Sequence, residues 1–514
     1  MNLLLLAPAI LLLAAAAVAR DWRLRHLVEL FAVAALAVAV IAAVVLGVDG
    51  PATSPLIGEA GIGLSARRDV VSITLLLLIT FVGWIVVRFT ATYLDGEPRN
   101  GRFMSGLCLT LASVVAMVVA GNLVQLVVAW IATSLALHRL LLFYPDRPAA
   151  QRAARKKFIT ARIGDVALVA AAVVLAAGYG TTDIATILAA ARAGHAVPEG
   201  AAAAGLIAVA AMLKSAQFPL HGWLTEVMEA PTPVSALLHA GVINAGGFVL
   251  IRFADVVLLS PAALAVLVLV GGVTALFGGL VMLTQPAVKT SLAWSTVAQM
   301  GFMMMECGFG LFPLALLHLV AHSLYKAHSF LAAGGAVERI AAARRPGAVA
   351  VPSATAVGRA FLVALGLYAA TGAVFGISHA PPQVVALGAI LIFGVAYLIA
   401  QGLAEAAPRA LTRRLVVSSV AASAGYFVLH ALAERLTVTT LPPPLPLSSL
   451  DWALVILAVV SFGGVAVAQA LFPLWSAHPA AAGLRVHLSN GLYANAVLDR
   501  MLGGWTTSRT GGAR

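Results

Sequence analysis

Long apolar stretches separated by short polar links make up almost the whole chain. Each stretch is close to the roughly 20 residues that an α-helix needs to cross a bilayer. We delimit fifteen of them, at residues 3–19, 26–48, 69–88, 103–120, 122–143, 158–178, 201–218, 232–254, 261–283, 291–310, 312–337, 357–378, 383–402, 411–431 and 450–472. The fourth and the fifth meet at Gly121-Asn122. The pattern therefore predicts an all-α, polytopic transmembrane helix bundle of about 14–15 spans.

Basic residues gather in alternate links, which predicts the orientation of the bundle. Because cytoplasmic loops retain Lys and Arg, the richer links are expected inside the cell. The protein is therefore expected in the cell membrane, or inner membrane, with its N-terminus outside and its C-terminus in the cytoplasm. The first run has its basic residues after it, so we interpret it as a span and not as a cleaved signal peptide. The residues are Arg20, Arg23, Arg25, Arg99, Arg102, Arg147, Arg152, Arg155, Lys156, Lys157, Lys289, Arg339, Arg344, Arg345, Arg409, Arg413 and Arg414.

Two of the apolar runs are interrupted in a way that predicts broken helices. Residues 217–222 interrupt the seventh run, and Pro231 and Pro233 open the eighth. Proline removes a backbone donor, and inside a membrane such a break needs protein or water to satisfy the freed groups. Broken helices at mid-depth are typical of ion and substrate sites in transporters. A simple kink is the alternative.

Composition and charge exclude a soluble protein and a nucleic-acid ligand. Of 514 residues, 61% are hydrophobic and only 10% are charged, whereas soluble domains average about 25% charged residues. The net charge of +12 follows from the positive-inside rule, because the basic residues form no continuous face. Cys108 and Cys307 lie in apolar surroundings and predict neither a disulfide nor a metal site.

The few lysines are the first candidates for ion-conducting chemistry. Lys156 and Lys157 are assigned to a loop, and Lys289 to the end of a span, but Lys214 and Lys326 fall well inside apolar runs. Placing an ammonium there costs roughly 2.5–3.5 kcal/mol, which makes a function the default expectation. Unlike arginine, a buried lysine can release and regain its proton. A purely structural lysine, paired with carbonyl groups or a carboxylate, is the alternative.

Histidines extend this hypothesis to a stripe along one helix. His318, His322 and Lys326 are spaced four residues apart, so they lie on one face. Histidine exchanges protons near neutral pH, which suits a proton relay. Zinc binding by the two histidines is the alternative, disfavoured because we expect no carboxylate or cysteine on that face. His239 fits the same relay, whereas His328 points away and is predicted to be a packing residue.

Carboxylates inside the apolar runs are sparse. Arg162 and Asp165 are three residues apart and are predicted to pair across one helical turn. Glu226 and Glu229 follow the interruption of the seventh run and are predicted to modulate Lys214. Glu306 is a further carboxylate within a run.

Four segments combine the candidate residues with the helix breaks: LKSAQFPLHGWL at 213–224, APTPVSALLHA at 230–240, KTSLAWST at 289–296 and HLVAHSLYKA at 318–327. They resemble the signatures of the antiporter-like family, which contains the large membrane subunits of respiratory complex I and of multisubunit cation/proton antiporters. The resemblance implies that Lys214 is the central proton-translocating lysine and that Lys326 belongs to the connecting relay. The candidate relay residues are Lys214, His239, His318, His322, Lys326, Lys289, Arg162, Asp165, Glu226, Glu229, His221 and His138.

Two features depart from the family's pattern. The family has a glutamate after the tryptophan of the fifth span, but here Ile131 follows Trp130. No lysine follows Lys326 either, so the family's exit lysine has only His379 or Glu405 as a nearby substitute. A complete respiratory proton pump is therefore disfavoured.

A narrower resemblance concerns DabB, the family of membrane subunits of inorganic carbon pumps. Residues 130–138, 143–148 and 153–158 and the total length carry it. It implies a transporter subunit, not an enzyme, in which protons or sodium ions drive the uptake of carbon dioxide or bicarbonate. It also implies a cytoplasmic partner similar to DabA, which would hold zinc, whereas this chain would hold no cofactor and no metal. The alternatives are a proton-translocating subunit of an NADH-quinone oxidoreductase or antiporter, and a non-conducting scaffold.

Together these features predict three parts. Residues 1–102 would form N-terminal transmembrane helices, 103–402 an antiporter-like proton-translocating core, and 403–514 C-terminal helices. The last part would end in an amphipathic tail along the cytoplasmic surface.

Overall fold

The computed structural model describes residues 2–195, 197–335, 353–376, 380–402, 409–475 and 477–501. A helix, or a set of short helices, coincides with each of the fifteen predicted runs. The helices are α1 (Ala7–Val18), α2 (Arg25–Asp49), α3 (Val70–Tyr93), α4 (Asn100–Val118), α5 (Leu123–Leu141), α6 (Pro148–Tyr179), α7 (Ile184–Arg192), α8 (Gly200–Lys214), α9 (Gly222–Glu226), α10 (Thr232–Ala240), α11 (Ala245–Arg252), α12 (Ala254–Val257), α13 (Pro261–Met282), α14 (Val288–Gly308), α15 (Phe312–Leu331), α17 (Ala354–Val374), α18 (Pro382–Gly402), α19 (Arg409–Thr437), α20 (Ser449–Ala470), α21 (Phe472–Trp475), α22 (Pro479–Ser489) and α23 (Ala494–Met501).

This helix content confirms the predicted all-α membrane bundle. Within the described ranges, nine helices are long and apolar enough to span a bilayer, and three shorter apolar helices accompany them. The strands of the described residues are confined to two small antiparallel pairs between α2 and α3: β1 (Ala52–Thr53) with β4 (Arg67–Arg68), and β2 (Ile57–Glu59) with β3 (Ile62–Leu64). The division into three parts stays a prediction.

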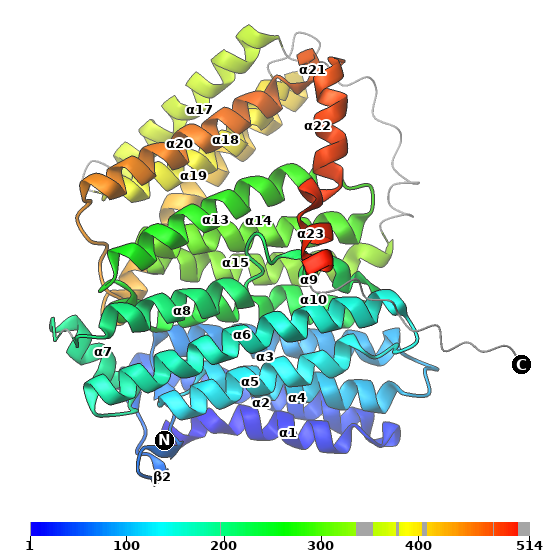
Figure 1. Ribbon diagram of the computed structural model, residues 1–514, viewed down its shortest axis with the longest axis vertical. Coiled ribbons are helices and arrows are strands. Elements are labelled where there is room, and N and C mark those ends of the chain that lie inside the picture. The colour runs from blue at the N-terminus through cyan, green and yellow to red at the C-terminus, as the bar shows by residue number, and fades with distance from the viewer. Residues whose placement is uncertain are drawn as a thin grey trace, which may run out of the picture.

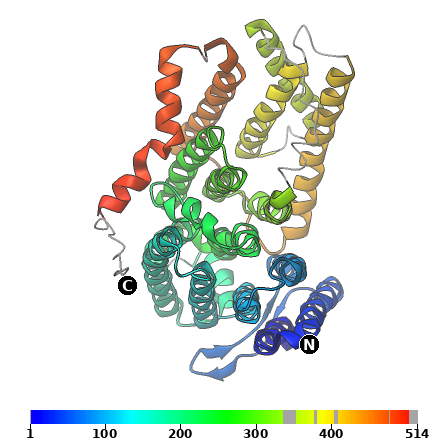
Figure 2. The same cartoon turned by 90° about the vertical axis from the view of Figure 1, so that its right-hand side faces the viewer.

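The helices lie side by side and run mostly between two ends of the molecule (Figure 1). One end carries the β2–β3 hairpin and α7; we call it the hairpin end. The other carries α22 and α23; we call it the tail end. In the view of Figure 2, α1–α6 occupy the lower part of the bundle and α17–α20 the upper part, with α8–α15 between them. The central group therefore has protein on both sides.

The predicted break at residues 217–222 is present, and α10 begins at Thr232, directly after Pro231. Helix α8 ends at Lys214, and regular helix resumes only at Gly222. A further break, which the sequence analysis did not predict, separates α10 from α11 at the short 3-10 turn Val242–Asn244. The two breaks face each other, because Ser215 Oγ donates to the carbonyl of Ile243 at 2.9 Å. Protein groups thus satisfy the freed backbone, as a break inside a membrane requires.

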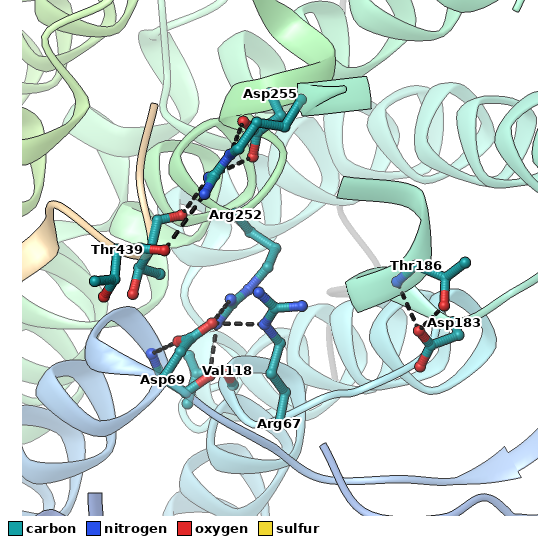
Figure 3. Close-up of polar contacts among 11 residues, drawn as sticks. Arg67, Asp69, Val118, Asp183, Thr186, Arg252, Asp255 and Thr439 are labelled. Carbon is teal, nitrogen blue, oxygen red and sulfur yellow. Dashed lines mark hydrogen bonds and ion pairs between the residues drawn. The ribbon is translucent and has the colours of Figure 1, made fainter. Parts of the chain in front are cut away.

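A buried charge cluster that the sequence analysis did not identify holds α3 against α11 at the hairpin end (Figure 3). Asp69 caps α3 by accepting from the Ser72 amide at 2.8 Å. Its carboxylate also pairs with Arg252 and Arg67, each at 2.5 Å. Burial alone would raise the pKa of Asp69, but the two guanidinium groups hold it below its usual value. A buried pair of this kind is costly to break, so it fixes the start of α3.

A second ion pair at the same end ties the C-terminal helices to the core. Arg192 of α7 forms two hydrogen bonds with Asp255, at 2.8 and 3.0 Å. The same guanidinium donates to the carbonyls of Thr439 and Thr440, which follow α19, at 3.3 and 2.7 Å. Figure 3 shows Asp255 and Thr439 on either side of this contact.

Two expectations about single residues are wrong. Helix α6 begins at Pro148, ten residues before the predicted run, so Lys156 and Lys157 lie on a helix and not in a loop. Both are buried, with 2% and 4% of their surface exposed. His328 is exposed and is not a packing residue.

Candidate proton-relay site

Lys214 is the last residue of α8 and therefore lies at the first helix break. The side chain is 6% exposed. Its Nζ is 4.2 Å from the centroid of the Trp130 ring and 3.4 Å from the Trp130 carbonyl oxygen. An ammonium over a tryptophan face is attracted by the ring's quadrupole, more strongly where water is excluded. Trp130 of α5 therefore holds the buried charge.

The same tryptophan connects Lys214 to a carboxylate. Trp130 Nε1 donates to Asp165 Oδ1 at 2.8 Å. Arg162 Nη2 lies 2.6 Å from Asp165 Oδ2, which confirms the predicted pair. The side chain of Trp130 thus connects the Asp165 carboxylate to Lys214. Ile131, which follows Trp130, has no carboxylate to contribute.

Lys157 is a second buried lysine near Lys214. Its Nζ donates to the carbonyl and to the hydroxyl of Ser134, at 2.7 and 2.9 Å. Lys157 and Lys214 line one small cavity, together with Leu137, Ala161, Leu213, Trp223 and Val242. The sequence missed Lys157 because its helix extends well before the apolar run.

Glu226 contacts Lys156 and not Lys214, which differs from the expectation. Lys156 Nζ lies 2.7 Å from Glu226 Oε1 and 2.5 Å from Asp499 Oδ1. It also donates to Asn495 Oδ1 at 3.0 Å. The side chain of Glu229 lies outside the described part of the chain, as do His379 and Glu405.

The predicted stripe lies on one helix, α15. Lys326 is fully buried, and its Nζ donates to Ser295 Oγ at 2.7 Å and to the Leu292 carbonyl at 3.1 Å. The rings of His318 and His322 are 6.2 Å apart between centroids. Both ring nitrogens of His322 are buried without a hydrogen-bond partner among the described residues. Such groups call for an explanation, and an exchanging proton or a bridging water supplies one.

A carboxylate does lie beside the stripe, contrary to expectation. Glu306 of α14 is buried, and its Oε2 is 2.9 Å from His318 Nδ1. The reason is that α14 packs against α15, which a one-helix pattern cannot reveal. Among the described residues, no group of three or more His, Cys, Asp or Glu could hold a metal ion.

The other histidines occupy separate positions. His239 is fully buried, with Nδ1 3.0 Å from Thr296 Oγ1 and its ring stacked on Phe330. His221 lies among aromatic rings, 5.0 Å from that of Trp294. His138, on α5, contacts the ring of Phe158.

The remaining lysine, Lys289, lies at the start of α14 and is half-buried. Its Nζ donates to Thr232 Oγ1 at 3.0 Å. That bond ties the start of α14 to the start of α10 at the tail end.

The second broken helix lies between the two lysine sites. Ser215, next to Lys214, bonds to Ile243 as described above. Asn244 then donates through Nδ2 to Ser323 Oγ of α15 at 2.8 Å. A polar contact therefore leads from the α8 break to the stripe, although no hydrogen bond joins Lys214 to His239 within the described ranges. Asn244 is a buried amide in an apolar run, a signal that the sequence analysis passed over.

The tail covers the break from the tail end. A Cβ at Gly222 would lie 2.0 Å from Asn495 Oδ1, and one at Gly491 would lie 3.3 Å from the Trp294 ring, so both glycines permit close contact. Gln285 also donates to the Ser489 carbonyl at 3.3 Å. With the pair between Lys156 and Asp499, these contacts place α23 over α9, as Figure 1 shows.

Substituting Asp499→Asn is expected to loosen this contact. The substitution removes the negative charge that pairs with the buried ammonium of Lys156. Proteolysis within 490–501 should therefore become about tenfold faster, equivalent to ~1.4 kcal/mol. Limited proteolysis of the purified protein measures it. Arg500→Gln, an exposed neighbouring charge, is the control and should cleave as wild type does. Equal rates in both variants would show that the pair does not hold the tail.

Comparison with known proteins gives a consistent set of relatives. The family model "NADH:quinone oxidoreductase/Mrp antiporter, TM" matches residues 120–346. A second, "NADH-Ubiquinone oxidoreductase (complex I), chain 5 N-terminus", matches residues 56–104. The probable inorganic carbon transporter subunit DabB2 of Halothiobacillus neapolitanus is 39% identical over 97% of this chain and 93% of its own length. The probable subunit DabB of Hydrogenovibrio crunogenus is 48% identical over 52% of each chain.

Solved structures share the fold at low sequence identity. A chain of the Mrp complex from Dietzia sp. is 21% identical, with a TM-score of 0.64; the match covers 97% of this chain and 59% of that one. A chain of respiratory complex I from Thermus thermophilus is 19% identical, with a TM-score of 0.58; the match covers 95% and 99%.

Proposed function

The chain belongs to the DabB family of inorganic carbon transporter subunits, and on this basis we propose that it powers carbon uptake. It conducts protons or sodium ions through its buried lysines and histidines. This flow drives the inward transport of carbon dioxide or bicarbonate by the assembled complex.

The observation that carries the proposal is Lys214. An ammonium buried at a helix break costs several kcal/mol, which a scaffold has no reason to bear. Its neighbours Trp130 and Asp165 stabilise the charged form, while the surrounding apolar residues favour the neutral form. A lysine balanced in this way can take up and release a proton as nearby charges change.

The proposed path has two lysine sites and a link. Protons reach Lys214 from the tail end through the cavity shared with Lys157. They pass along the polar contacts of the second break to Lys326, His322 and His318, where Glu306 accepts them. Water can bridge the remaining gaps between these groups.

The partner we propose is a DabA-like subunit on the cytoplasmic side, which is the tail end of the bundle. That subunit would hold the zinc and perform the carbon chemistry, so this chain would act as the membrane motor and not as an enzyme. The orientation follows from the basic residues, which collect at the tail end. In this orientation the protein crosses the inner membrane with its N-terminus outside and its C-terminus in the cytoplasm.

Co-expression tests the proposal. A bacterial host without carbonic anhydrase should grow at ambient carbon dioxide when it contains this chain together with a DabA-like zinc-binding protein. Either protein alone should fail to restore growth. Failure of the pair, with both proteins present in the membrane fraction, would overturn the proposal. Co-purification with quinone-oxidoreductase subunits would favour the respiratory role instead.

A further inference from the structure

A cleft at the tail end is not used by the proton path proposed above, although His138, one of the candidate relay residues, lines it. It has a volume of about 950 Å³ and lies where α1 and α5 end and α4 begins. Its rim comes from Arg20, the segment 98–102 and the last turn of α5. This cleft is far larger than the small cavity beside Lys214.

The charge on the cleft is entirely positive. Arg20, Arg99, Arg102 and Arg139 line it, and no Asp or Glu does. Arg99 lies 3.4 Å from Glu97 and stacks over the Phe143 ring. In the part of the chain that the structure describes, no carboxylate pairs with the other three arginines, so the rim presents unpaired positive charge that complements an anion.

The apolar lining of the cleft begins at the rim and continues inward. Phe103, Leu140 and Phe143 lie level with the arginines, and Leu109 lies farther along α4. Leu109 is nine residues beyond Asn100, the first residue of α4, which corresponds to about 13 Å along the helix axis. The cleft therefore extends from the helix ends, at the depth of lipid headgroups, toward the depth of acyl chains.

We propose that this cleft binds an anionic phospholipid. The arginines on the rim hold its phosphate group, because a guanidinium group donates two parallel hydrogen bonds to phosphate oxygens. The acyl chains lie along the apolar wall. Basic pockets between transmembrane helices on the cytoplasmic side suit such headgroups. A free phosphate ion would use only the rim, and an acidic protein segment would leave the apolar wall uncovered.

Thermal unfolding of the purified full-length protein in detergent tests the site. Adding phosphatidylglycerol or cardiolipin should raise the melting temperature by several degrees, whereas phosphatidylcholine and inorganic phosphate should not. The variant Arg102→Gln/Arg139→Gln should need at least about tenfold more anionic lipid for the same shift. The control Arg152→Gln/Arg485→Gln removes two exposed charges away from the cleft and should behave as wild type does.

Three results would overturn the proposal. Equal stabilisation by phosphatidylcholine would show a generic lipid effect, and stabilisation by inorganic phosphate would show a free-anion site. An unchanged lipid response in the cleft variant would show that the phosphate binds elsewhere. The substituted arginines are exposed, so the variant should melt normally without lipid. If it does not, native mass spectrometry of Arg102→Gln alone should show the loss of bound anionic lipid, and its retention would contradict the site.

Discussion

Replacing Lys214 by alanine is expected to abolish inorganic carbon uptake while the protein still inserts and binds its partner. The variant removes the one titratable group held at the α8 break over Trp130. Losing a positioned proton-transfer group costs about a hundredfold or more in rate. Lys214→Arg should also fail, because arginine keeps its proton at neutral pH. Growth at ambient carbon dioxide and uptake of labelled carbon measure both variants.

The control for this prediction is Arg152→Ala, which removes an exposed cation from α6. It should leave uptake unchanged. Immunoblots of the membrane fraction separate loss of function from loss of protein. Full growth of Lys214→Ala at ambient carbon dioxide would eliminate this lysine from the transport mechanism.

For the stripe on α15, substitutions that remove a titratable group should reduce uptake more than substitutions that only change side-chain volume. Lys326→Ala is expected to reduce uptake most, because it removes the lysine that bonds to Ser295. His322→Gln should reduce uptake strongly at normal abundance, because glutamine keeps a hydrogen-bonding side chain but cannot carry a proton. His328→Gln, on the exposed side of the same helix, is the matched control and should keep full uptake.

Different outcomes separate the alternatives for the stripe. A structural stripe would tolerate glutamine, while bulky apolar substitutions would lower protein abundance. A zinc site would co-purify with metal and lose it on substitution. Uptake, abundance and metal content measured in the same variants distinguish the three. Wild-type uptake by His322→Gln would rule out the relay as proposed.

The spans and the break between α8 and α10 could be predicted because they depend on local sequence, whereas the break at Val242–Asn244 contains no proline and was not predicted. Run length fixes a transmembrane helix, and the prolines around 217–233 fix where helices cannot continue. The stripe also followed from spacing on one helix. The pair formed by Arg162 and Asp165 is likewise local, one turn apart on α6.

What the sequence could not supply depends on contacts between distant segments. Glu226 and Lys156 are 70 residues apart, and Asp69 and Arg252 are 183 apart. Nothing in the spacing identifies such partners. Arg252 did carry a signal, since it is a charged residue inside the run 232–254.

The position of Asp165 explains how the lysine site can lack the glutamate of the family pattern. In the family pattern that carboxylate would follow Trp130, where this chain has Ile131. Here the carboxylate comes from α6 and reaches the lysine site through the indole of Trp130. A negative charge near Lys214 is therefore retained, although it reaches the lysine less directly.

The most direct test of cation-driven uptake is the initial rate of labelled inorganic carbon uptake by cells containing this chain and its partner. The rate is measured before and after a protonophore, and separately in sodium-free medium. We expect uptake to fall to the level of Lys214→Ala cells when the driving gradient is collapsed. Which treatment causes the fall identifies the ion. Uptake at the full rate with both gradients collapsed would contradict the account.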